Sequence, residues 1–132
     1  MIVVDSSALV AILKKEPDGP GFAAAIRDAD RAVVSAVNVH ETGMVLRARL
    51  GPDAIQDLYD ALAALDIEIV PFEAGDARAA LEAFERYGKG LPNSAGNLNL
   101  CDCVAYALAK VLQAPLLFKG NDFAATDIAR CL

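Results

Sequence analysis

Four short, mostly apolar runs constrain the fold of this chain most strongly. They lie at residues 2–4, 32–35, 67–70 and 115–118. Such runs are typical of strands that are buried on both faces of a parallel sheet. Because segments with helical spacing lie between them, the alternation predicts an α/β fold with a mainly parallel sheet. The run at 115–118 is expected to form a buried central strand.

The segments between these runs predict six helices and two irregular regions. Ser6 or Ser7 is the expected cap of the first helix. The sequence GKGLPNSAGN predicts a flexible loop, and residues 126–131 are expected to add a short edge strand. Residues 1–132 are therefore predicted to form one domain, an α/β/α sandwich with a sheet of four to five strands. The expected helices span residues 8–14, 22–28, 37–50, 73–87 and 100–112, and another starts at residue 53. This last helix carries an apolar stripe that is expected to lie in the core, at Ile55, Leu58, Leu62 and Leu65.

Composition excludes several classes of protein. The net charge of −6 gives no support to a broad nucleic-acid-binding surface, although close basic pairs such as Arg47 and Arg49 can form small rims. Three cysteines, an odd number, argue against a disulfide framework. The N-terminus does not resemble a signal peptide, and no apolar segment is long enough for a membrane helix. We therefore expect a cytoplasmic protein with no membrane partner.

Acidic residues fall where an α/β fold places its ligand site. Asp5 follows the first strand and Asp122 follows the fourth, and such sites lie beyond the carboxyl ends of parallel strands. Glu41 lies early in the helix after the second strand, near the same edge. Asp102 lies in the first turn of the helix before the fourth strand, so topology places it less firmly. Taken singly, each acid also has a structural explanation. Asp5 could be a helix cap and Asp102 a partner of the helix dipole, while Glu41 could be a solvated side chain and Asp122 a turn residue.

Taken together, the acids predict a cation site. Asp5 and Asp102 are flanked by apolar sequence, and burying a carboxylate is costly unless a cation or hydrogen bonds compensate it. Several converging carboxylates would also repel one another. A hard divalent cation resolves both problems, and ligation by oxygen atoms alone points to Mg²⁺ or Mn²⁺.

Four stretches in order along the chain carry a resemblance to a known family. They are IVVDSSALVAIL, NVHETGMVL, LNLCDCVAYALAK and APLLFKGNDFAATDI. With them the chain resembles the PIN-domain ribonucleases over essentially its whole length, and the VapC toxins of bacterial toxin–antitoxin pairs in particular. Two departures bear on how a substrate is positioned. Cys101 stands where this subgroup often has Gly, and the loop at residues 89–97 is longer and less basic than is usual.

The resemblance implies a role for each matching residue. Ser6 matches a hydroxyl residue that helps to order the metal site, while Lys119 and Asn121 match positions that contact the substrate or order the loop. His40, the only histidine, points away from Glu41 around the helix and is not expected to act in catalysis. The family's catalytic acids fall on Asp5, Glu41, Asp102 and Asp122, where all but Glu41 would hold Mg²⁺, or Mn²⁺ in its place, and Glu41 would ligate the metal or orient the attacking water.

The resemblance also implies an activity and partners. The reaction is Mg²⁺-dependent hydrolysis of RNA by an endoribonuclease, which leaves a 5′-phosphate and a 3′-hydroxyl and inhibits translation and growth. A cognate VapB-type antitoxin would hold the enzyme inactive, in a homodimer or a toxin–antitoxin hetero-oligomer.

Three alternatives remain open from the sequence alone. One is a non-catalytic PIN-like module that binds RNA or protein. Another is a phosphatase of the haloacid-dehalogenase type, although that chemistry needs a second Asp where this chain has Ser7. The third is a DNA-directed nuclease of related fold, for which the chain lacks the insertions needed to thread DNA.

Overall fold

A single parallel sheet organises the structure, a computed structural model that describes residues 1–132. Its four strands are hydrogen-bonded in the order β3-β2-β1-β4, and every neighbouring pair is parallel. The predicted α/β fold with a sheet of four to five strands is confirmed. The strands are β1 (Ile2–Val4), β2 (Ala32–Ser35), β3 (Ile67–Val70) and β4 (Leu116–Leu117).

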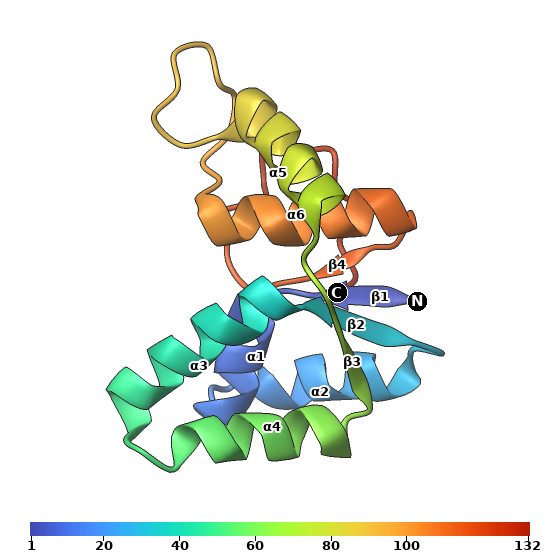
Figure 1. Cartoon of the computed structure of the whole chain (residues 1–132). Helices are drawn as coiled ribbons and strands as arrows, with labels where there is room; N and C mark the ends of the chain where they lie inside the picture. Colours follow the sequence, from blue (N-terminus) through green and yellow to red (C-terminus); the bar gives the residue numbers. More distant parts are fainter.

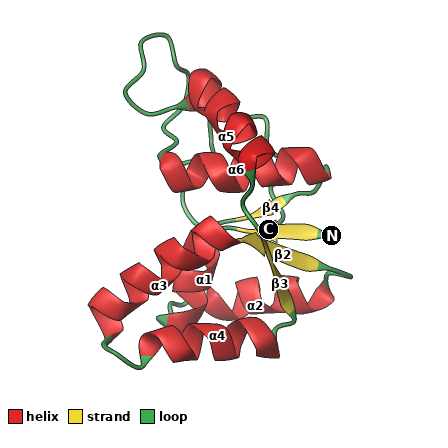
Figure 2. Cartoon of the chain, in the orientation of Figure 1, coloured by secondary structure: helices red, strands yellow, loops and turns green.

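Helices cover both faces of this sheet (Figure 1). One layer holds α5 and α6, and the opposite layer holds the other four helices, as the colouring by secondary structure also shows (Figure 2). None of the helices is both long enough and apolar enough to cross a membrane. The helices are α1 (Ser6–Leu13), α2 (Gly19–Asp28), α3 (Ala36–Leu50), α4 (Ala54–Ala64), α5 (Ala74–Tyr87) and α6 (Leu100–Leu112).

The strands β1, β2 and β4 are buried throughout because each face of the sheet packs against its own helical layer, whereas the edge strand β3 exposes Glu68 and Ile69. Successive side chains of a strand point to opposite faces. Ile2 and Val4 of β1 therefore pack in the core shared with α1 to α4, whereas Val3 packs in the core shared with α5 and α6. This two-sided burial explains why the sequence shows continuous apolar runs rather than an alternating pattern.

The position of β4 differs from the prediction. It lies at the edge of the sheet, beside β1, rather than at its centre. The segment after it was expected to form a strand, but it makes only one isolated bridge, between Arg130 and Leu116. Leu116 N–H donates to the Ala129 carbonyl at 2.9 Å, and Cys131 N–H donates to the Leu116 carbonyl at 3.0 Å. This short contact covers the edge of β4 without extending the sheet.

Two helix starts also differ from the prediction. The N-cap of α1 is Asp5 rather than Ser6 or Ser7, since the Asp5 side chain accepts a hydrogen bond from the Ser7 N–H at 3.0 Å. The helix α2 begins at Gly19, three residues earlier than expected. Pro20 lies in its first turn, where a proline is tolerated because the missing N–H would have no partner within the helix.

The predicted apolar stripe of α4 is only partly buried. Leu58 and Leu62 lie in the core and Leu65 packs against it. Ile55 is 44% exposed, so its assignment to the core was wrong. It lies in the first turn of the helix, at the end of the stripe.

Candidate active site

The four carboxylates singled out in the sequence line one pocket, with a volume of about 370 Å³. Asp5 directly follows β1 and Asp122 lies in the loop after β4, and these strands are paired neighbours. Glu41 reaches the pocket from α3 and Asp102 from the first turn of α6. Because β1, β2 and β4 are parallel, their carboxyl ends meet at the edge where these segments converge. Other polar side chains in the lining are Ser6, Ser7, Glu16, Arg49, Asn99 and Lys119.

Asp5 is buried, with 3% of its surface exposed, and is held by one neighbour. Its Oδ2 atom accepts hydrogen bonds from Ser7 N–H at 3.0 Å and from Ser7 Oγ at 2.6 Å. Ser7 Oγ in turn accepts from Lys119 N–H at 2.9 Å, which ties α1 to the loop after β4. Burial raises the pKa of Asp5 to about 6, against the lowering effect of the Ser7 hydrogen bonds, and the charge of Glu41 adds to the rise.

Asp102 is fixed by a capping box at the start of α6. Asn99 N–H donates to Asp102 Oδ2 at 3.1 Å, and Asp102 N–H donates to Asn99 Oδ1 at 2.9 Å. This reciprocal pair satisfies two backbone donors that no helical carbonyl can reach. The pKa of Asp102 is raised to about 7, mainly by burial and also by the charges of Asp5, Asp122 and Glu41, against the lowering effect of the hydrogen bond from Asn99.

One face of α3 forms a wall of the pocket. Glu41, Val45 and Arg49 all line it, and their spacing of four residues places them on the same side of the helix. Glu41 is half-buried and Arg49 is exposed. Arg49 forms no ion pair, so the lining contains one unpaired guanidinium two turns away from Glu41.

Asp122 is exposed and lies in a turn that depends on glycine. Gly120 has a φ of 94°, a left-handed conformation that a residue with a side chain adopts only under strain. Phe123 is buried and packs on Phe118, with 4.8 Å between the ring centroids, and so anchors the loop to the core as expected. Asn121 is exposed and does not line the pocket.

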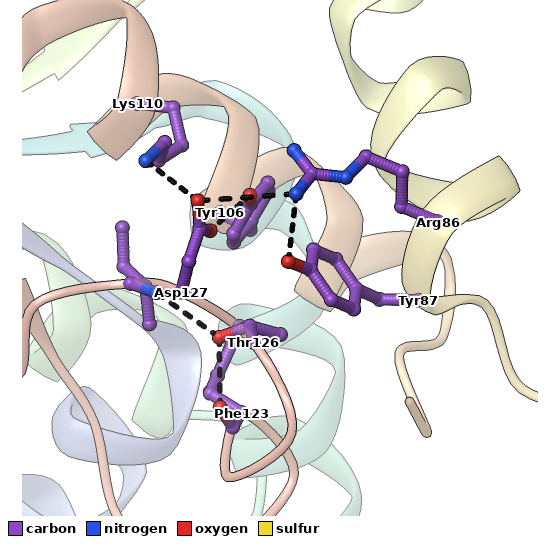
Figure 3. A network of polar contacts seen from close by, with 8 residues as sticks. Arg86, Tyr87, Tyr106, Lys110, Phe123, Thr126 and Asp127 are labelled. Atoms are coloured by element: carbon purple, nitrogen blue, oxygen red, sulfur yellow. Dashed lines mark hydrogen bonds and ion pairs between the residues drawn. The ribbon is translucent and has the colours of Figure 1, made fainter. Parts of the chain in front are cut away.

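The far end of this loop is anchored to α6 by a second polar cluster (Figure 3). Tyr106 Oη donates to Asp127 Oδ1 at 2.5 Å, and Lys110 Nζ donates to Asp127 Oδ2 at 3.1 Å. Arg86 on α5 approaches the same carboxylate at 4.0 Å. These partners lower the pKa of Asp127, with the Tyr106 hydrogen bond as the largest cause.

Two other residues singled out in the sequence do not contact the acids. The Lys119 ammonium lies 3.1 Å from Asp18 and 3.5 Å from Glu16, and this pairing raises its pKa. The Ser6 hydroxyl donates to the Asn38 carbonyl at 3.2 Å and accepts from Asn38 Nδ2 at 3.1 Å. Ser6 therefore ties α1 to α3 rather than bonding to Asp5.

The structure adds residues that sequence reasoning missed or left unassigned. Asn99 precedes Asp102 by three residues, which is the spacing of a capping box and could have revealed it. Arg49 follows Glu41 by eight residues, so helical spacing could have singled it out from the other basic pairs. Ser7 follows Asp5 by two residues, which is the spacing of an N-cap hydrogen bond and could also have revealed it. Nothing local marks Asn38 as a link between helices.

The donors of the pocket suit a divalent cation in their chemistry. Carboxylate oxygens are the ligands that Mg²⁺ and Mn²⁺ prefer. Burial and the neighbouring carboxylates raise the pKa values of Asp5 and Asp102, and a bound cation would favour the charged forms of both. No three of the His, Cys, Asp and Glu side chains are close enough together to form a complete metal-binding group as they stand. In their chemistry the residues fit a cation, but the carboxylates would have to move closer together to hold it.

A second, apolar pocket of about 490 Å³ lies between α5 and α6. Its lining consists of hydrophobic side chains, including Phe84, Leu100 and Val104. It offers no acid, base or metal ligand other than the thiol of Cys103, whose pKa burial raises to about 11. Of these two pockets, only the acidic one carries carboxylates that could bind a cation.

An open parallel sheet with four carboxylates in one pocket at its carboxyl edge defines an α/β protein with a candidate cation site. The model of the PIN domain family matches residues 2–129, and the chain belongs to this family. The family predicted from the four sequence stretches is thus confirmed.

Similar proteins place the chain among the VapC ribonucleases of this family. It is 41% identical to ribonuclease VapC30 of Mycobacterium tuberculosis, with 97% of this chain and 96% of that protein covered. Among solved structures, the sarcin–ricin loop cleaving toxin VapC20 of M. tuberculosis has a TM-score of 0.79 at 16% identity and covers 98% of this chain and 97% of its own. VapBC2 from Rickettsia felis, bound to a DNA fragment from its promoter, has a TM-score of 0.72 at 18% identity and covers 98% and 96%. At these identities the two structures support the fold alone.

Proposed function

We propose that this chain is a Mg²⁺-dependent endoribonuclease and the toxin of a toxin–antitoxin pair. The observation that carries the proposal is the convergence of Asp5, Glu41, Asp102 and Asp122, from four distant segments, on one pocket. Its relatives are ribonucleases, which agrees with this chemistry and disfavours a non-catalytic binding module. RNA in the cytoplasm is the proposed substrate.

The proposed roles follow from where each side chain lies. Asp5, Asp102 and Asp122 are the residues that would hold the cation, Mg²⁺ or Mn²⁺. When bound, the cation neutralises charge on the phosphate and makes a water molecule more acidic. Glu41 is half-buried on the α3 wall and orients the attacking water. Ser7 holds Asp5 in place through its two hydrogen bonds.

The cations of the lining complete the proposed substrate site. Arg49 has no ion-pair partner, so it is free to bind an RNA phosphate two helical turns from Glu41. Lys119 is already paired with Asp18 and Glu16, so its main proposed role is to order the loop, with phosphate binding secondary. Asn121, which lies outside the lining, would order the turn.

A VapB-type antitoxin is the proposed partner. The solved neighbours include a toxin–antitoxin complex from Klebsiella pneumoniae and VapBC2. An antitoxin arginine or lysine placed among the four carboxylates would form charge-assisted hydrogen bonds and compensate their repulsion. Association as a homodimer or a toxin–antitoxin hetero-oligomer is part of the same proposal.

The test compares the wild-type protein with Asp5→Asn and Glu41→Gln on a labelled single-stranded RNA. We expect cuts with 5′-phosphate ends from the wild type with Mg²⁺, and none from either variant or in excess EDTA. Asp57→Asn is the matched control, because Asp57 is an exposed carboxylate on α4 that does not line the pocket. Equal cleavage by the wild type and Asp5→Asn would contradict the proposal.

A further inference from the structure

Asn38 is fully buried and joins three helices. Its Nδ2 atom donates to Ser6 Oγ at 3.1 Å and to the Cys101 carbonyl at 3.2 Å. Ser6 belongs to α1, Asn38 to α3 and Cys101 to α6. In return, Ser6 Oγ donates to the Asn38 carbonyl at 3.2 Å, so the contact between α1 and α3 is reciprocal.

Each of these three contacts lies beside a proposed catalytic acid. Ser6 follows Asp5, and Cys101 precedes Asp102. Glu41 follows Asn38 by three residues, about one turn along α3. One amide group therefore links the backbone segments that carry three of the four acids.

The amide is not arranged for the greatest stability. Asn38 Oδ1 is buried and has no hydrogen-bond partner. The opposite orientation of the amide would place Oδ1 against the Cys101 carbonyl, which can only accept, so the contacts fix the orientation. A buried acceptor without a partner costs roughly 1–3 kcal/mol. A side chain kept at that cost calls for a reason other than stability.

The charges in the pocket supply such a reason. The charges of Glu41, Asp5 and Asp122 act on the buried Asp102, and the resulting repulsion favours separation of the segments that carry them. Hydrogen bonds from a neutral amide resist this separation without adding charge. A cation or lysine at the same place would compensate the acids and compete with a metal ion for them.

We propose that Asn38 is a positioning residue that sets the spacing of Asp5, Glu41 and Asp102 for metal binding and catalysis. The inference rests on the proposed function, because it assigns a role within that site. Asn38 touches neither substrate nor reacting atoms, and it acts through Ser6 and Cys101.

The test is Asn38→Ala, with Thr42→Val as a matched control. Thr42 is equally buried on the same helix, but its Oγ1 bonds only to the Asn38 carbonyl, at 2.7 Å, and links no other element. Two readouts are measured: Mn²⁺ affinity, by electron paramagnetic resonance titration of the protein alone, and steady-state cleavage of a labelled RNA. Stability is followed in parallel by thermal unfolding.

For Asn38→Ala we expect Mn²⁺ affinity and kcat each to fall about 10- to 100-fold, the range found for residues that orient metal ligands. KM for RNA should stay within about twofold, because the exposed lining is unchanged. Thr42→Val should keep the Mn²⁺ affinity and kcat of the wild type even if it loses as much thermal stability. Equal Mn²⁺ affinity for Asn38→Ala and Thr42→Val would overturn the inference.

Two further outcomes are covered, a failure of the variant to fold and an inactive wild-type protein. If Asn38→Ala does not fold, Ser6→Ala removes both hydrogen bonds between Ser6 and Asn38 with a smaller change in volume, and a wild-type Mn²⁺ affinity in it would overturn the inference. A wild-type protein that binds no Mn²⁺ and cuts no RNA would instead contradict the proposed function. That result is distinct from wild-type behaviour of the Asn38 variant.

Discussion

The two ends of α6 hold carboxylates in opposite ways. At its start, Asp102 lies among other acids, and burial raises its pKa to about 7. Towards its end, Asp127 meets Tyr106, Lys110 and Arg86, which lower its pKa (Figure 3). The second carboxylate is compensated by its neighbours and the first is not.

Asp102 also caps α6, but unlike Asp127 it has no cationic partner, so its charge remains available to bind a cation. Asp127 fastens the C-terminal loop to α6, and its charge is already satisfied there. Neither Asp102 nor Asp5 forms an ion pair, so a metal ion or a basic antitoxin side chain could neutralise their charge. Substitutions at the two ends should therefore affect activity and stability in opposite proportions.

The largest effect is expected for Asp5→Asn. Activity should fall at least about 100-fold, more than for residues that only orient metal ligands. Thermal stability at pH 7.5 should be unchanged or higher, because a buried charge is removed and Asn caps helices as well as Asp does. RNA cleavage and thermal unfolding measure the two effects. Retained activity, or a fall in Tm of more than about 5 °C, would break the comparison.

The second-largest effect is expected in the dependence of thermal stability on pH, to which Asp5 and Asp102 should contribute most. The pKa values of Asp5, about 6, and Asp102, about 7, lie above the unfolded value of 3.8. The folded protein therefore binds protons more readily than the unfolded chain. The stability that these acids contribute is full below the unfolded value and is lost as the pH rises through about 6 and 7.

In metal-free buffer, the Tm of the wild type should thus fall by about 5 °C or more between pH 5 and pH 8, relative to the double variant Asp5→Asn, Asp102→Asn. Added Mg²⁺ should recover most of this loss at pH 8 in the wild type alone. The double variant controls for groups that titrate elsewhere. If Tm changed with pH equally in the two proteins, the raised pKa values of Asp5 and Asp102 would be contradicted.

A smaller effect, mainly on stability, is expected for Asp127→Ala. The change leaves the buried Tyr106 hydroxyl without its acceptor and should cost about 1–2 kcal/mol. Activity should fall less than about tenfold, because Asp127 reaches the site only through the loop that carries Asp122. Asp127→Asn keeps an acceptor for Tyr106 and should lose less stability. Denaturant unfolding and RNA cleavage measure both, and a larger loss of activity than of stability would oppose the assignment.

The smallest effects should distinguish the two cations of the pocket. Arg49→Ala should raise KM for RNA a few-fold and reduce the slope of log KM against log salt by about 0.7, the value for one phosphate contact on a single strand. Lys119→Ala should change that slope less, because its ammonium is already paired. The measurement is the salt dependence of cleavage kinetics. A larger change for Lys119 than for Arg49 would reverse these assignments.

Much of the fold could be predicted from local sequence patterns. The sequence runs at residues 32–35 and 67–70 predicted β2 and β3 at their observed bounds, and β2 is buried along its whole length. The place of β4 could not be predicted, since strand order depends on pairing with β1 across the chain. The cap of α1 was misassigned because Asp and Ser are almost equally good caps and only the folded backbone selects between them.

The candidate site divides in the same way. Strand ends and family resemblance were sufficient to single out the four acids that line the pocket. Asn38 was missed as a support because its bond to Cys101 spans 63 positions of sequence, and the bond from Lys119 N–H to Ser7 spans 112 positions. Such contacts leave no periodic signal, so they become visible only when the helices are placed relative to one another.

The pairing of the first strand with the last has a consequence for the timing of synthesis. Asp5 is made early, but β4 and Asp122 are made more than a hundred residues later. At the usual speed of translation, this separation lasts on the order of 10 s. Throughout that interval the nascent chain lacks one wall of its own pocket. A ribosome producing this protein is therefore not exposed to an assembled site on the same nascent chain until the segment through Asp122 has emerged.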